Sequence, residues 1–293
     1  MQLLARPAFK TYARAPVLGA TLGVFLVMSS IVVSSHRFWA FFSLEGLLIV
    51  GGGVIAVAFM SYEGEDVRKA LQAIKSMFKK PSRIQENLHG DMMAIIYCAR
   101  LVKDKGMRNL ESIIGKSTIG DPFVKYGLNM VVSQYTPDEV RAMMETAADA
   151  SCERDSIPAD ILQAMASHAP AFGMVGTLVG MVAMLCGLSD DISSIGSSLA
   201  VSFLSTLYGV LSARMIYMPA ASKLRQEIAD RRFRNYLITE GMVMLVANKT
   251  PMFIQDRLNS FLRPEVHDYY DVMDAKPAAP AAPPPPKRMA VAA

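Results

Sequence analysis

Two long apolar segments, separated by a short polar loop, constrain the possible folds of this chain more than any other feature. Each segment, 170–188 and 198–218, has enough mostly apolar residues to cross the roughly 30 Å hydrocarbon core of a bilayer as a helix, and neither contains an Asp or Glu. Small and hydroxyl-bearing residues recur along both at helical spacing: Gly173, Gly176, Thr177 and Gly180 in the first, and Ser205, Thr206 and Gly209 in the second. Polar side chains at this depth usually face protein or water. The pattern therefore predicts surfaces for helix packing and for an ion path.

Two further spans are predicted near the N-terminus, at 16–34 and 44–60, the second opening with Glu45 and containing three consecutive glycines at 51–53. An early apolar stretch preceded by basic residues is also typical of a cleaved secretory signal. This stretch is long, and another span follows it after a very short loop, which favours a retained anchor. The prediction is therefore four membrane helices.

The distribution of basic residues predicts the orientation. Arg6, Lys10 and Arg14 precede the first span, and five basic residues lie between 223 and 234, whereas the loop between the third and fourth spans carries Asp190 and Asp191. Basic residues concentrate on the cytoplasmic side, so both termini and the connection 61–169 are expected there. The predicted fold class is an all-α integral membrane protein, with four transmembrane helices, a helical cytoplasmic domain between spans 2 and 3, and a C-terminal cytoplasmic helix.

The predicted division of the chain follows from this topology. It comprises a cytoplasmic N-terminus (1–15), transmembrane helices 1 and 2 (16–60), a cytoplasmic helical domain (61–169), transmembrane helices 3 and 4 (170–218), cytoplasmic C-terminal helices (219–264) and a disordered Pro/Ala-rich tail (265–293). Cytoplasmic helices are predicted at 63–78, 92–105, from 137 onward, at 223–246 and at 252–262. The start at 137 rests on Thr136 followed by Pro137, Asp138 and Glu139, which is a helix N-terminus pattern.

Nothing in the composition points to an enzyme. The three cysteines and four histidines have no metal-ligand or redox spacing, and there is no glycine-rich phosphate loop or nucleophile elbow. We expect reduced thiols, no metal and no cofactor. The net charge of +4 is explained by the topology and requires no nucleic-acid partner.

Two sequence runs resemble a known family. Residues 169–180 (APAFGMVGTLVG) and 204–211 (LSTLYGVL) are similar to the third and fourth spans of the flagellar stator A subunits of the MotA/PomA family. Further matches lie at 47–53, 109–111 and 240–262, so the resemblance covers most of 44–264. The wider MotA/TolQ/ExbB superfamily shares the two-helix channel core, but TolQ and ExbB have three spans and an external N-terminus. Four spans with internal termini favour the stator branch.

The resemblance implies a ring of A subunits, thought to be a pentamer, around a dimer of a single-span MotB/PomB-like B subunit in the bacterial inner membrane. Flow of H⁺ or Na⁺ would be coupled to flagellar rotation through contact with a FliG-like rotor protein. The inner spans contain no Asp, Glu or His, so a titratable group must come from elsewhere; in the family it is an aspartate of the B subunit. The alternatives are a TolQ/ExbB-like energising subunit that drives an envelope partner, and an unrelated membrane scaffold.

Each candidate residue in the spans has a functional and a structural interpretation. Thr177, Ser205 and Thr206 fall on the family's ion-path positions, but membrane hydroxyls often bond carbonyls of their own helix. Pro170 and Pro219 are family positions for conformational coupling, or they are simple helix punctuation. The four glycines Gly173, Gly176, Gly180 and Gly209 are assigned to helix packing, which by itself explains a small-xxx-small pattern.

Charged residues have the same ambiguity. Arg214, near the end of the fourth span, is expected to extend to the headgroups, with a gate contact as the alternative. Candidate rotor contacts in the cytoplasmic loop are Lys103, Arg108, Glu111, Lys116 and Asp121, although such charges often form only a solvated surface.

Overall fold

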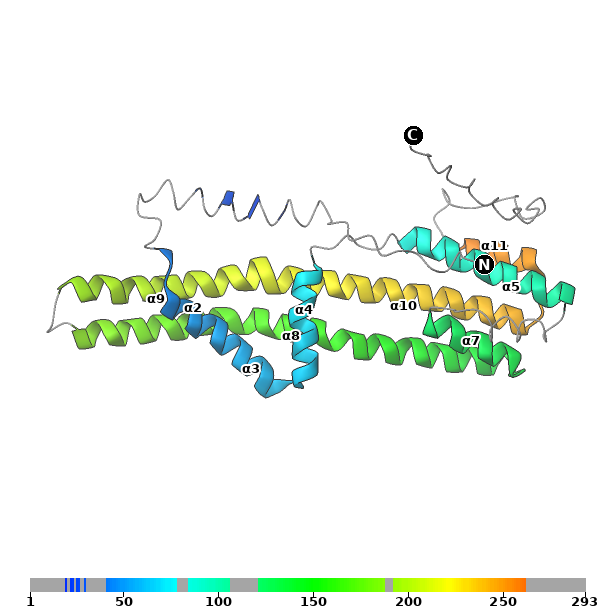
Figure 1. Cartoon of the computed structure of the whole chain (residues 1–293), viewed down its shortest axis with the longest axis horizontal. Helices are drawn as coiled ribbons and strands as arrows, with labels where there is room; N and C mark the ends of the chain where they lie inside the picture. Colours follow the sequence, from blue (N-terminus) through cyan, green and yellow to red (C-terminus); the bar gives the residue numbers. More distant parts are fainter. Residues whose placement is uncertain are drawn as a thin grey trace, which may run out of the picture.

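Two long antiparallel helical rods form the frame of the molecule (Figure 1). The computed structural model describes residues 41–77, 84–105, 121–187 and 192–261, together with single residues or pairs between 19 and 29. The first rod is α8 (Pro137–Cys186), and the second is a continuous helix made of α9 (Ile192–Ser212), the wide π-helical turn η4 (Ala213–Tyr217) and α10 (Met218–Val246). At about 1.5 Å per residue α8 is roughly 75 Å long, far more than a bilayer core requires.

The start of α8 confirms the sequence prediction. Thr136 caps the helix by accepting a hydrogen bond from the backbone of Glu139, and the Glu139 carboxylate accepts one from the backbone of Thr136. The helix then continues without interruption through Pro158 and Pro170 into the membrane segment. The apolar span and the charged part of the chain before it are thus joined by one continuous helix.

The predicted second span is formed by three consecutive helical pieces. These are α2 (Leu44–Leu47), the π-helical turn η2 (Leu48–Gly52) and α3 (Gly53–Ser61), which together lie against α8 and α9. Ser43 caps α2 by accepting a hydrogen bond from the backbone of Gly46. Gly53 allows close packing, because a Cβ at this position would come within 2.3 Å of the Phe172 ring.

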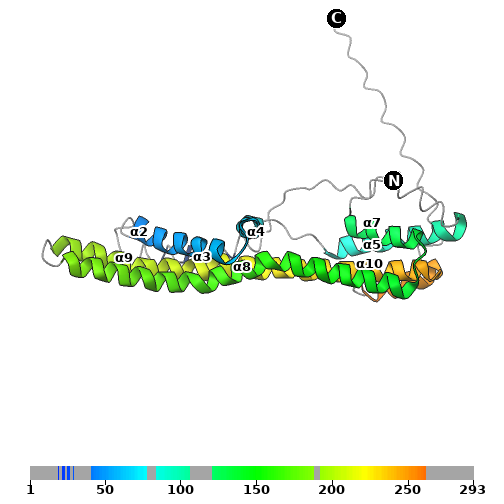
Figure 2. The same ribbon diagram turned by 90° about the horizontal axis from the view of Figure 1, so that it is seen from below.

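Four shorter helices complete the described fold. α4 (Gly64–Ser76) follows the second span and crosses the two rods, whereas α5 (Ile84–Lys105), α7 (Pro122–Val132) and α11 (Pro251–Asn259) surround the far end of α8 and α10 (Figures 1 and 2). The predicted helix at 63–78 and the interruption at Thr250 are confirmed, since Thr250 caps α11. The helix predicted at 92–105 is longer in the structure, since α5 begins at Ile84. We did not predict α7, although Asp121 followed by Pro122 is a start signal for it.

The buried side chains form two separate cores. One lies at the end of the rods away from the apolar spans, among α5, α7, α8, α10 and α11, and includes Met92, Met144, Leu237 and Ile254. The other lies where α3 and α4 meet the middle of α8 and the start of α10. Both cores therefore bring together residues that lie far apart in the sequence.

Three helices within the described residues are long and apolar enough to cross a membrane. They are Leu44–Ser61 and segments of Pro137–Cys186 and Ile195–Val246. The predicted first span lies largely outside the described residues, so a count of four stays a prediction. The N-terminus before residue 16 and the Pro/Ala-rich tail also lie outside them.

Candidate functional site

The glycines of the two membrane helices bring α8 and α9 into direct backbone contact. A Cβ on Gly173 would lie 3.0 Å from the Thr206 Cα, and one on Gly209 would lie 2.6 Å from the carbonyl oxygen of Ala169. A Cβ on Gly176 would lie 2.3 Å from the Ser205 Cβ, and one on Gly180 would lie 2.2 Å from the Ser202 Oγ. These positions exclude any larger side chain, so they form a small-residue packing surface.

The three predicted ion-path hydroxyls differ in their surroundings. Thr177 donates to the Met174 carbonyl of its own helix at 2.6 Å, and Ser205, fully buried, donates to Val201 at 2.7 Å. Thr206 instead donates across the interface to the Gly173 carbonyl on α8 at 3.3 Å. Ser205 thus lies inside the packed interface, while Thr177 and Thr206 are partly exposed. Lining of an ion path stays a prediction for all three.

Tyr208, which the sequence pattern did not single out, connects the second span to α9. Its hydroxyl donates to the Phe41 carbonyl at 2.6 Å and accepts from the Ser43 backbone N–H at 2.9 Å. Unpaired backbone groups are costly in an apolar environment, so this hydroxyl stabilises the chain just before α2. A Tyr flanked by glycine and hydroxyl residues in an apolar span was the available signal.

The two prolines have different positions relative to the helices. Pro170 is half-buried in the middle of α8, where the helix shows no break. Pro219 is exposed in the first turn of α10, immediately after the π-helical turn η4. π-Helical turns within α-helices often occur at functional sites. Conformational coupling at either proline stays a prediction. Arg214 lies within η4, is exposed, and contacts the Met218 sulfur at 3.4 Å.

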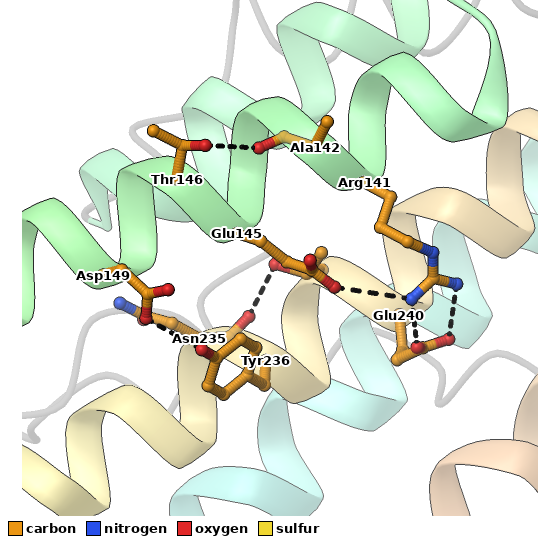
Figure 3. A network of polar contacts seen from close by, with 9 residues as sticks. Arg141, Ala142, Glu145, Thr146, Asp149, Asn235, Tyr236 and Glu240 are labelled. Atoms are coloured by element: carbon orange, nitrogen blue, oxygen red, sulfur yellow. Dashed lines mark hydrogen bonds and ion pairs between the residues drawn. The ribbon is translucent and has the colours of Figure 1, made fainter.

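Beyond the apolar spans, ion pairs link α8 and α10 along their length. The Arg141 guanidinium donates two hydrogen bonds to the Glu240 carboxylate, at 2.5 and 3.2 Å, and the Tyr236 hydroxyl donates to Asp149 at 2.8 Å (Figure 3). The hydrogen bonds from Arg141 hold the pKa of Glu240 below its ordinary value, although burial alone would raise it. Three more pairs connect the same helices: Arg225 with Asp160, Arg231 with Asp155, and Arg232 with Asp149.

One arginine of α10 connects three helices of the core formed by α5, α7, α8, α10 and α11. Arg234 binds both carboxylate oxygens of Asp91 on α5, and it also binds Asp121, which caps α7. Burial would raise the pKa of Asp121, but the hydrogen bonds and charge of Arg234 and two backbone N–H groups of α7 hold it below its ordinary value. Asp121, a candidate rotor contact, is therefore engaged inside the protein.

Of the other candidate rotor contacts, only Lys103 lies within the described residues. Lys103 is exposed near the end of α5. Arg108, Glu111 and Lys116 lie outside the described residues. Within the described ranges, no group of three His, Cys, Asp or Glu residues is arranged to hold a metal ion.

These observations define a helical membrane protein whose glycine-packed span pair continues into a second helical region beyond the spans. A model of the MotA/TolQ/ExbB proton channel family matches residues 116–235. Motility protein A of Cereibacter sphaeroides is 30% identical over 220 residues, which cover 74% of this chain and 83% of that protein. Chemotaxis protein PomA of Vibrio alginolyticus is 29% identical over 249 residues, 85% of this chain and 88% of PomA.

A solved structure described as C. jejuni MotAB has the same fold. It aligns with a TM-score of 0.75 at 22% identity and covers 87% of this chain and 99% of the matched chain. The chain belongs to the MotA/TolQ/ExbB proton channel family. More particularly, it is a stator A subunit of a flagellar motor, as the resemblance predicted. This family consists of channel proteins rather than enzymes.

Proposed function

We propose that the chain forms a ring, most simply a pentamer, around a single-span B subunit in the bacterial inner membrane. The ring would have four spans per subunit and both termini in the cytoplasm, and would conduct H⁺ or Na⁺ at its interface with that subunit. Support comes from the names of the relatives, which include motility proteins A and PomA, and from the fold of MotAB complexes.

The absence of Asp, Glu and His from the two spans indicates that the chain needs a partner. Residues 170–188 and 198–218 provide hydroxyls and glycines but no Asp, Glu or His. A proton that crosses the bilayer beside these helices requires a titratable group at that depth. We assign it to the B subunit, and we assign Thr177 and Thr206, whose side chains are partly exposed, to the lining of the path.

The long helices provide the mechanical connection. Because α8 and the rod α9–η4–α10 are each continuous from the span to the cytoplasmic core, a movement of the span is transmitted without an intervening loop. Pro170 and the η4–Pro219 region are the places where such a helix bends most easily. The cytoplasmic end, with Lys103 on its surface, would then contact the rotor.

The test compares ion flux with and without the partner. The purified full chain in proteoliposomes should pass no ions above background. Co-reconstitution with an aspartate-bearing single-span B subunit freed of its periplasmic plug should give a measurable influx, and changing that aspartate to asparagine should stop it. Conduction by the chain alone at the rate of the complex would contradict the proposal.

A further inference from the structure

α4 is fixed at the membrane boundary in an unusual direction. It begins at Gly64, just after the second span ends at Ser61, and it crosses α8 and α10 instead of following them (Figures 1 and 2). Because α3 and α8 carry membrane spans, a helix that crosses them lies along the bilayer surface. Val67 and Ala70 are fully buried against this frame, and the Lys223 ammonium donates to the Met77 carbonyl at the end of α4.

The exposed part of α4 has two chemically different sides. Arg68, Gln72 and Lys75 are spaced four and three residues apart, so they form one stripe, and all three are exposed. Lys69 points elsewhere and pairs with Glu65 at 3.2 Å and Asp66 at 3.0 Å. Its charge is therefore compensated within α4. The stripe, in contrast, carries two positive charges; the acidic residue that borders it, Glu65, lies three residues before Arg68 and is paired with Lys69.

Gly64 shows which way this stripe faces. It precedes Arg68 by four residues and so lies on the same side of α4. A Cβ built on Gly64 would meet the Phe59 ring at 3.6 Å, and Phe59 belongs to the last part of the second span, where its side chain is 51% exposed. The stripe therefore follows the side of α4 that is turned toward the span and the surrounding bilayer.

We propose that the Arg68–Lys75 stripe of α4 binds the headgroup phosphates of anionic lipids. Neither side chain has an ion-pair partner among the described residues. Both are long enough to extend from the helix to the headgroup layer while their methylene groups remain against apolar surface. An arginine can bind a phosphate through two parallel N–H groups, and a lysine adds a point charge.

This contact would fix α4 at a defined depth. Its apolar side is bound to the two rods and its basic side to the lipid surface, so the position of the rods relative to the membrane would be set by charge as well as by hydrophobic length. The proposal concerns the end of the second span only. It does not depend on the presence of a B subunit or a rotor.

The test uses a local reporter. Gln72→Trp in a Trp39→Phe background places the only tryptophan of the chain between the two basic residues. The full chain in nanodiscs is then quenched with brominated phosphatidylglycerol or brominated phosphatidylcholine, and the ratio of the two apparent affinities is measured. Each basic residue near an anionic surface is expected to contribute about a fivefold preference. The wild-type stripe should favour phosphatidylglycerol, and R68Q/K75Q should lower the ratio by roughly tenfold or more.

Two controls distinguish this site from general charge. K69Q removes a compensated lysine of the same helix and should change the ratio less than twofold, whereas R68K/K75R should keep it. Without any substitution, 1 M salt should abolish the preference, because the screening length falls to about 3 Å. A ratio that is unaffected by R68Q/K75Q, equally reduced by K69Q, or insensitive to salt would overturn the proposal.

Discussion

Gly209→Ala tests the backbone contact between the two membrane helices. The added Cβ would lie 2.6 Å from the Ala169 carbonyl oxygen and 3.2 Å from the Gly173 Cα, whereas ordinary contact begins at 3.4 Å. Both are backbone atoms, so no change of rotamer relieves the contact. The helices would have to separate by about 0.8 Å, the difference between 3.4 and 2.6 Å. The nearby hydrogen bond from Thr206 to Gly173 would lengthen with them.

The expected magnitude is the difference of two effects. Overpacking of a close contact costs about 1–3 kcal/mol. Alanine is intrinsically preferred over glycine in a helix by about 0.5–1 kcal/mol, which offsets part of this. We expect a net loss of about 1–2 kcal/mol, and a thermal midpoint lower by roughly 2–3 °C for a chain of this size.

Gly196→Ala is the matched control on the same helix. A Cβ at Gly196 meets nothing within 4 Å, so only the helix preference should act and the midpoint should stay constant or rise slightly. The assay heats the detergent-solubilised protein and measures the remaining monodisperse fraction by size-exclusion chromatography. If Gly209→Ala unfolds at or above the wild-type midpoint, or if Gly196→Ala loses as much, the close-contact argument is wrong.

Three further perturbations follow from individual contacts. Tyr208→Phe leaves two backbone groups before α2 without their partner, so thermal unfolding in detergent should show a loss of about 1–3 kcal/mol; an unchanged midpoint would mean that water replaces the hydroxyl. Thr206→Ala removes the bond to Gly173 and should reduce swimming speed more than membrane abundance, with normal speed excluding a role in the ion path. Because the hydrogen bonds from Arg141 hold the pKa of Glu240 below its unfolded value, their stabilisation is complete above the unfolded pKa of about 4.3 and is lost as the pH falls through the lower folded pKa. An Arg141→Met variant should therefore show a weaker loss of stability on acidification than the wild type, and an identical loss would exclude this pair as a cause.

Much of the architecture follows from local sequence patterns. Hydropathy identified the second span and the apolar parts of α8 and α9. The helix start at Thr136 and the interruption at Thr250 were predicted correctly, because such signals depend on residues within one turn. The glycine pattern likewise predicted a packed interface, which the structure places between α8 and α9. Such features depend on near neighbours in the chain.

The tertiary structure alone decided how these pieces are joined. A proline inside a helix costs about 3 kcal/mol locally, yet α8 passes through Pro158 and Pro170 because packing along the whole rod outweighs that cost. Asp121 appeared to be a free surface charge, but Arg234, 113 residues later, binds it.

Local sequence patterns also do not determine the direction of a helix that follows a membrane span. The sequence by itself determined that the chain spans a membrane with apolar helices rich in glycine and hydroxyl groups. Only the three-dimensional arrangement decided that α4 crosses the rods and leaves Arg68 and Lys75 exposed. The physical reason is that hydropathy and capping act over a few residues, whereas the direction of a helix is set by contacts with residues far away in the chain.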